Sequence, residues 1–201
     1  SSLIVKHDVP ILSTSNCERL LSASVKKEIK PVVFTARPSL PPRGVQDEAH
    51  YYSPEAELAV ELVGLDSIPM IASGRTEWLA WEIGADPHTF IKPALVHALA
   101  AIGAAISGDE IAGLMAAHMF LYKGILNSPL SDLIGCELKV TVFEDSYRSI
   151  DSVSKVLDLL HEFGVQSSLI AKGIAVNHEK RKLLYESGAA LFDDVNSAIT
   201  D

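Results

Sequence analysis

Short apolar runs alternate with segments of helical periodicity along the whole chain. In the helical segments, apolar positions recur at three- and four-residue steps. We predict strands at residues 3–5, 31–34, 68–72, 89–91, 139–146, 166–171 and 189–192. We predict helices at residues 16–27, 54–63, 76–83, 93–106, 109–122, 147–163, 180–187 and 193–199. This alternation is typical of an α/β fold with a mostly parallel sheet.

The strand at residues 139–146 ends in two adjacent carboxylates. Glu144 and Asp145 follow its apolar residues, and a helical pattern begins directly after Ser146. Ligands of α/β proteins bind at such carboxyl ends of parallel strands. Mg²⁺ suits this place, because it often binds through one or two carboxylates and a substrate phosphate. The alternative is that both acids cap the following helix and stabilise its positive end.

Polar side chains also follow other predicted strands. The second strand ends at Thr35, and the proline-rich loop after it carries Arg37 and Arg43. These two guanidinium groups could grip a phosphate in bidentate fashion, although a solvated surface loop has the same composition. Lys92 stands between a predicted strand and Pro93, which begins the next helix. Its ammonium either points to the same edge of the sheet or is simply solvated.

Composition narrows the class of protein. The chain has 201 residues, 48% of them hydrophobic, and its formal net charge is −9. We therefore expect one domain over residues 1–201 and no nucleic-acid or anionic-membrane partner, because such partners need a basic face. The longest apolar segment, residues 94–106, is too short to span a bilayer. Two cysteines without metal-binding spacing favour a reduced, cytoplasmic protein.

With Asp8 after the first apolar run, polar residues follow four strands in order. This pattern resembles the haloacid dehalogenase-like superfamily of phosphatases and phosphotransferases. Phe143-Glu-Asp-Ser146 is similar to the fourth motif of that family, Lys92-Pro93 to the third, and Val33-Phe-Thr35 to the second. The resemblance implies a three-layer α/β/α sandwich with a mostly parallel, Rossmann-like sheet.

The resemblance also implies a role for each matching residue. Asp8 would be the nucleophile, and Thr35 and Lys92 would stabilise charge on the phosphoryl group. Arg37 and Arg43 would position the substrate. Asp8, Glu144 and Asp145 would hold Mg²⁺.

The first motif departs from the family pattern. The family has Asp-x-Asp there, and its second Asp is the general acid and base. This chain has Asp8-Val9-Pro10, followed by Ile11 where the family has glycine. Proline cannot transfer a proton, so general acid–base help of typically about 10²–10⁴-fold is missing. The short interval between Asp8 and Thr35 leaves no room for a large cap domain, and residues 107–135 are a candidate helical insertion.

These observations lead to two main expectations. The first is a Mg²⁺-dependent phosphatase that acts on a small phosphorylated molecule through an aspartyl-phosphate. The alternative is a catalytically weakened or inactive relative that binds a phosphorylated ligand or a protein partner. An unrelated flavodoxin-like or Rossmann-like binding module is a third reading, against which no Gly-x-Gly-x-x-Gly follows a predicted strand. The Met-bearing helix at 109–122 is a candidate contact surface of a homo-oligomer.

Overall fold

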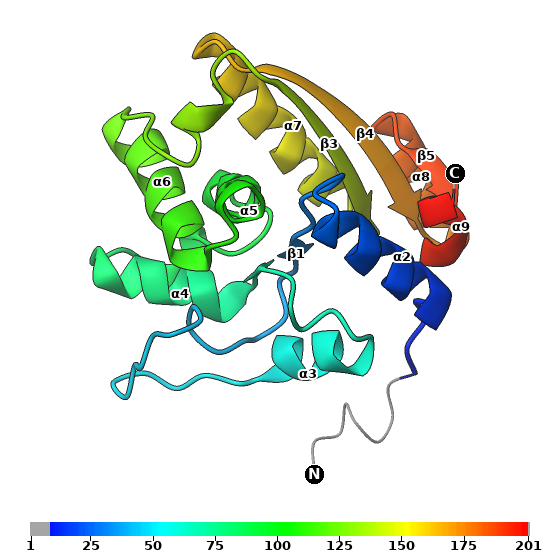
Figure 1. The fold of residues 1–201 in the computed structure, drawn as a ribbon, viewed down its shortest axis with the longest axis horizontal. Coiled ribbons are helices and arrows are strands. Elements are labelled where there is room, and N and C mark those ends of the chain that lie inside the picture. The colour runs from blue at the N-terminus through cyan, green and yellow to red at the C-terminus, as the bar shows by residue number, and fades with distance from the viewer. Residues whose placement is uncertain (1–8, 201) are drawn as a thin grey trace.

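A computed structural model describes residues 9–200 of the chain, in which helices alternate with parallel strands (Figure 1). The strands are β1 (Val33–Phe34), β2 (Met70–Ile71), β3 (Glu137–Glu144), β4 (Gln166–Ile174) and β5 (Ala190–Phe192). The α-helices are α2 (Thr14–Val25), α3 (Glu55–Leu62), α4 (Ser73–Glu82), α5 (Leu95–Ser107), α6 (Glu110–Lys123), α7 (Tyr147–Glu162), α8 (His178–Glu186) and α9 (Val195–Thr200). Short 3₁₀ turns lie at Pro87–Thr89 and Ser131–Leu133. The predicted α/β class is confirmed for the described residues, and the strand expected at residues 3–5 lies outside them.

The strands form two parallel pieces. In one piece β1 pairs with β2, and in the other β4 lies between β3 and β5. The β3–β4 pairing runs from Glu137 opposite Gln166 to Glu144 opposite Gly173. Since the strands within each piece are parallel, the segments that follow β1 and β2 leave one edge, as do those that follow β3 and β4. The residues after β1 and after β3 line a common pocket, described below.

The prediction of a strand at residues 89–91 is wrong. The chain forms a 3₁₀ turn there, because the Asp86 side chain accepts a hydrogen bond from the His88 N–H at 3.0 Å and Pro87 supplies a suitable first position. Phe90 follows, and its side chain is buried in the core. The next helix was expected to begin at Pro93 but begins at Leu95, after an extended Ala94.

Helix α5 lies at the centre of the core, between α6 and α7 (Figure 1). Its residues from Val96 to Ala104 are all buried. Helix α6 packs closely against it: a Cβ added at Gly113 would lie 2.5 Å from the Ala100 carbonyl oxygen, so only glycine fits. Leu114, Phe120, Leu130 and Leu133 belong to the same core cluster as α5. The 107–135 segment therefore shares the main core.

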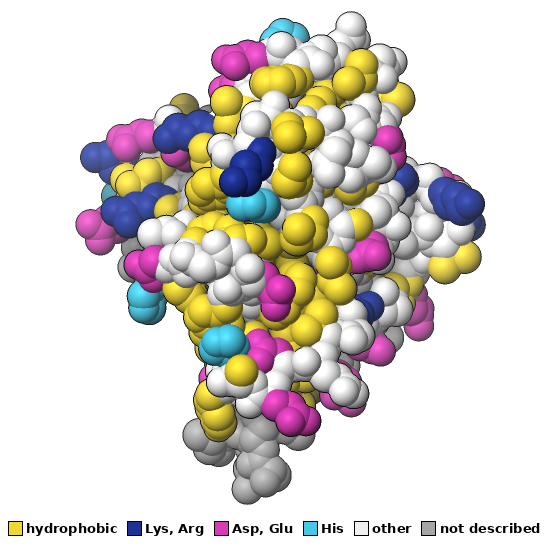
Figure 2. Space-filling model, turned by 90° about the vertical axis from the view of Figure 1, so that its left-hand side faces the viewer, with side chains coloured by type: hydrophobic (Ala, Val, Ile, Leu, Met, Phe, Trp, Pro, Cys, Tyr) yellow, Lys and Arg dark blue, Asp and Glu magenta, His cyan; other side chains and the backbone are white. Residues whose placement is uncertain are grey.

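The outward side of α6 carries apolar side chains. Figure 2 shows the face of the molecule on the α4 and α6 side, where hydrophobic atoms form an extended band. In α6 and directly after it, Met115, Tyr122 and Ile125 are exposed. The homo-oligomer expected from the Met-bearing helix remains a prediction. No helix within residues 9–200 is long and apolar enough to cross a membrane.

Candidate functional site

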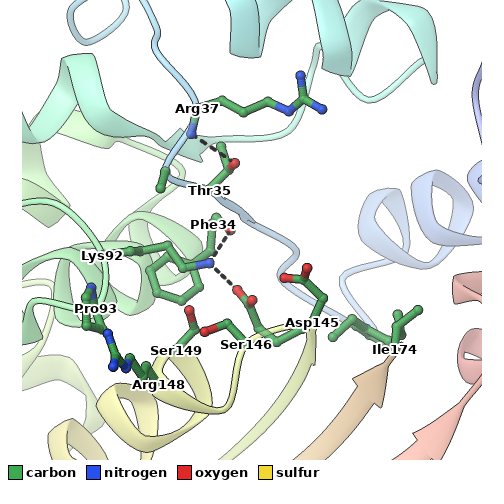
Figure 3. Close-up of a pocket in the computed structure, with 13 residues that line it drawn as sticks. Phe34, Thr35, Arg37, Lys92, Pro93, Asp145, Ser146, Arg148, Ser149 and Ile174 are labelled. Carbon is green, nitrogen blue, oxygen red and sulfur yellow. Dashed lines mark hydrogen bonds and ion pairs between the residues drawn. The ribbon is translucent and has the colours of Figure 1, made fainter. Parts of the chain in front are cut away.

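Three segments that are distant in sequence line one pocket of about 770 Å³. They are the segment after β1, the Lys92–Pro93 step before α5, and the turn that joins β3 to α7 (Figure 3). The volume is in the range of small-molecule sites, roughly 300–1,000 Å³. The lining residues include Thr35, Arg37, Lys92, Glu144, Asp145, Ser146, Arg148 and Ser149. The structure thus brings together five residues selected from the sequence, whereas Asp8 lies outside the described residues.

Lys92 is held by acceptors on two strands. Its ammonium forms an ion pair with the Glu144 carboxylate and donates to the Phe34 carbonyl oxygen at 3.3 Å (Figure 3). It also lies 3.9 Å from the centroid of the Phe34 ring, a favourable cation–π geometry. The exposed fractions of the Lys92 and Glu144 side chains are 11% and 8%. Burial raises the pKa of Glu144, and the attraction of Lys92 opposes this shift.

His97 positions the Lys92 backbone through a hydrogen bond, a role that the sequence did not reveal. The Lys92 backbone N–H donates to His97 Nδ1 at 3.0 Å, so Nδ1 is an acceptor and the ring proton is on Nε2. Nε2 then donates to the Ile71 carbonyl oxygen of β2 at 3.0 Å. Burial lowers the pKa of His97 to about 3, so the ring is neutral at pH 7. This chain of bonds ties the Lys92 backbone to the β1–β2 sheet.

Asp145 lies at the open rim of the pocket. Its carboxylate accepts from the ammonium of Lys180, at the start of α8, over 2.5 Å. The exposed fractions of these two side chains are 61% and 55%, so water screens the pair. Sequence reasoning missed Lys180, since its partner is 35 residues away. Asp145 can exchange this partner for a bound cation more easily than Glu144 can leave the buried Lys92.

Neither acid caps α7, contrary to the alternative reading of this stretch. The N-cap residue is Ser146, its side chain makes no capping hydrogen bond, and the first turn of α7 holds no acidic residue. The N–H groups of Tyr147 and Arg148 therefore have no helical acceptor. They form the positive end of a 16-residue helix that begins at the pocket.

Thr35 is fixed by its backbone, and its side chain lines the pocket. Its N–H donates to the Ile71 carbonyl oxygen at 3.1 Å. Its Oγ1 accepts from the Arg37 N–H at 3.3 Å. Among the described residues none accepts the Thr35 hydroxyl proton, so this group can donate to a ligand. The exposed side chain of Arg37 extends away from Lys92 at the upper side of the pocket (Figure 3).

The structure does not bring Arg43 to this pocket. The Arg43 guanidinium donates to the carbonyl oxygens of Asp66 and Ile68, each at 2.7 Å, and pairs with Glu110 at 3.4 Å. Glu110 is buried and also binds Arg75 at 3.2 Å. These contacts place Arg43 in a structural network beside a second pocket. The fold places Arg43 beside Glu110, the first residue of α6, although the two residues lie far apart in sequence. This contact keeps the Arg43 guanidinium away from the first pocket.

The two acidic residues that line the pocket differ in how well they suit Mg²⁺. No group of three or more His, Cys, Asp or Glu within residues 9–200 is arranged to hold a metal ion. Asp145 offers hard, exposed carboxylate oxygens of the kind that Mg²⁺ prefers. The Glu144 carboxylate already forms a buried ion pair with Lys92 and is therefore less accessible to a metal ion. Among the residues expected to bind the metal, Asp145 therefore fits best, and its expected partner Asp8 lies outside the described residues.

Comparisons of this chain with protein-family models, with curated proteins and with solved structures found no match.

Proposed function

We propose that this chain is a Mg²⁺-dependent phosphatase that acts on a small phosphorylated substrate. We further propose that its sheet is part of a three-layer, Rossmann-like fold of the haloacid dehalogenase-like type. The observation that carries the proposal is the convergence of Thr35, Lys92 and Asp145 on one pocket from three separate segments. Phosphoryl transfer needs hydrogen-bond donors and positive charge placed before the reaction begins. This pocket supplies both.

Each residue has a distinct task in this proposal. The Asp8 carboxylate attacks phosphorus, the bond to the leaving oxygen breaks, and water later hydrolyses the aspartyl-phosphate. The Thr35 hydroxyl donates to a phosphoryl oxygen. Lys92 supplies positive charge, and the ion pair with Glu144 orients its ammonium. When bound at Asp145 and Asp8, Mg²⁺ offsets phosphate charge.

Pro10 favours a second candidate function. Without a proton donor at this position, a leaving alkoxide receives no general-acid help. The chain would then be a weakened or inactive relative that binds a phosphorylated ligand or a protein partner. Both candidates use the same pocket, and they differ in whether turnover occurs.

The experiment is hydrolysis of an aryl phosphate, whose leaving group needs no proton donor. The wild type is assayed with Mg²⁺, without Mg²⁺, and beside Asp8→Asn. Turnover that requires both Asp8 and Mg²⁺ supports the phosphatase. No turnover, together with a rise in melting temperature in inorganic phosphate, supports the binding protein. Full activity of Asp8→Asn removes Asp8 from the mechanism.

A further inference from the structure

Arg148 lines the same pocket but has no task in the proposed chemistry. It is the second residue of α7 and lies on the Pro93 side of the pocket, across from Asp145 (Figure 3). Its side chain is exposed. Nothing in the sequence pattern singled it out, since one arginine in the first turn of a helix is usually a solvated surface residue.

The contacts of Arg148 leave its charge uncompensated. Its Nε donates to the hydroxyl of Tyr147 at 3.3 Å, and its guanidinium carbon lies 5.9 Å from the centroid of the Tyr147 ring. Tyr147 offers Arg148 a hydroxyl and a ring but no carboxylate. Within residues 9–200 no carboxylate pairs with Arg148, and no group accepts from its Nη1 or Nη2. These two nitrogens form the edge that binds carboxylate or phosphate in bidentate fashion.

The acids nearest in sequence are paired elsewhere. Asp151, three residues along α7, pairs with Lys155 at 2.7 Å. Asp145 pairs with Lys180, and Glu144 pairs with Lys92. The positive end of α7 adds to the charge of Arg148, because the first turn contains no acid. The Pro93 side of the pocket is therefore a place for an anion, separate from the ammonium of Lys92.

We propose that Arg148 binds a second anionic group of the phosphorylated substrate. The inference rests on the proposed function, in which Lys92 and Thr35 receive the phosphoryl group. The substrate class is then a small phosphorylated molecule that carries a carboxylate or a second phosphate. Arg148 is a specificity residue in this account, because it contacts a part of the substrate that does not react.

The test compares two probes that differ in one group. 3-Phosphoglycerate carries a carboxylate where glycerol 3-phosphate carries a neutral hydroxymethyl group. For each probe, kcat/KM and the Kd from calorimetry are measured in the wild type, in Arg148→Gln and in Lys155→Gln. Lys155→Gln is the matched control, because it removes one positive charge from the exposed side of the same helix. Arg148→Lys tests whether the bidentate geometry matters beyond the charge.

We expect the wild type to bind 3-phosphoglycerate about tenfold or more tightly than glycerol 3-phosphate. A hydrogen bond to a charged group typically contributes an effect of this size. Arg148→Gln should lose most of this preference, Arg148→Lys should keep part of it, and Lys155→Gln should keep it all. Equal loss in Arg148→Gln and Lys155→Gln would overturn the inference. A wild type that treats both probes alike would also overturn it, while phosphatase activity could still stand. If neither probe is hydrolysed but 3-phosphoglycerate binds through Arg148, the inference stands and the phosphatase proposal fails.

Discussion

Lys92 and Glu144 lie 52 residues apart in the sequence and form an ion pair at the inner wall of the pocket. Both side chains are nearly inaccessible to water. Removal of one partner from such a pair leaves a buried charge without compensation, which is costly. The pair therefore links the stability of the fold to the geometry of the site.

Lys92→Met should lower the free energy of unfolding by about 3–5 kcal/mol, because the Glu144 carboxylate loses its counter-ion. Glu144→Gln should also destabilise, and the double variant should cost less than the sum of the two changes. Denaturant unfolding measures all three. Lys180→Met is the control, since its exposed pair with Asp145 should be worth about 0–1 kcal/mol. Strictly additive effects of the Lys92 and Glu144 changes would contradict the pair.

The buried His97 should make stability depend on pH. Its pKa in the folded chain is about 3, below the ordinary value of 6.5, so the unfolded chain takes up the proton first as the pH falls. The free energy of unfolding should therefore be highest above pH 6.5 and decrease as the pH falls from about 6.5 to about 3, by up to about 1.4 kcal/mol per pH unit. Chemical denaturation at several pH values measures the slope.

His97→Asn should remove this part of the pH dependence, at a cost in stability. His161→Asn, at the exposed end of α7, is the control and should leave the slope almost as it is in the wild type. A wild-type slope that persists in His97→Asn would show that His97 is not the titrating group.

Gly113→Ala should destabilise the protein. Alanine in a helix interior is normally favoured over glycine by about 1 kcal/mol. Here the added Cβ would lie 2.5 Å from backbone atoms of Ala100 and Ala104, so α5 and α6 must move apart. We expect a net loss of about 1–3 kcal/mol, as for other overpacked sites. A higher melting temperature in Gly113→Ala would mean that the two helices are not this close.

Pro10→Asp should restore the missing proton donor. The expected effect is an increase in kcat of up to about 10²–10⁴-fold for alkyl phosphates, whose leaving groups need a proton. Aryl phosphates should respond much less. Comparison of the two substrate types in Pro10→Asp and the wild type checks this. An equal response of both types would argue against general-acid catalysis from this position.

Local patterns were sufficient to predict most elements. The helix expected at 147–163 is observed as α7 at Tyr147–Glu162, because Ile150, Val153 and Leu157 recur at helical spacing and are buried. The short run at 89–91 was misassigned, since three residues carry no periodicity and the capping contact of Asp86 decided the local conformation. Predictions from pattern succeed where the pattern is long enough to define a face.

The sequence predicts those parts of the site that lie directly after parallel strands. Polar residues after β1 and after β3 share a pocket with Lys92 because the topology directs them there. Which charges pair depends on tertiary placement. The Arg43 N–H donates to the Glu110 carboxylate at 3.0 Å, as part of a network separate from the pocket. The two residues lie 67 positions apart, and nothing in the sequence links them. Lys180 and His97 were missed for the same reason.

The most direct test of the central claim is hydrolysis of an aryl phosphate by the wild type, Asp8→Asn and Thr35→Val in parallel. Thr35→Val keeps the side-chain shape and removes the hydroxyl donor. We expect Mg²⁺-dependent turnover in the wild type, none in Asp8→Asn, and a decrease of about 10²–10³-fold in kcat in Thr35→Val. The melting temperature of Thr35→Val should fall only slightly, because the Arg37 N–H loses its acceptor. Equal turnover in all three proteins would contradict the proposal that this pocket is a phosphatase site.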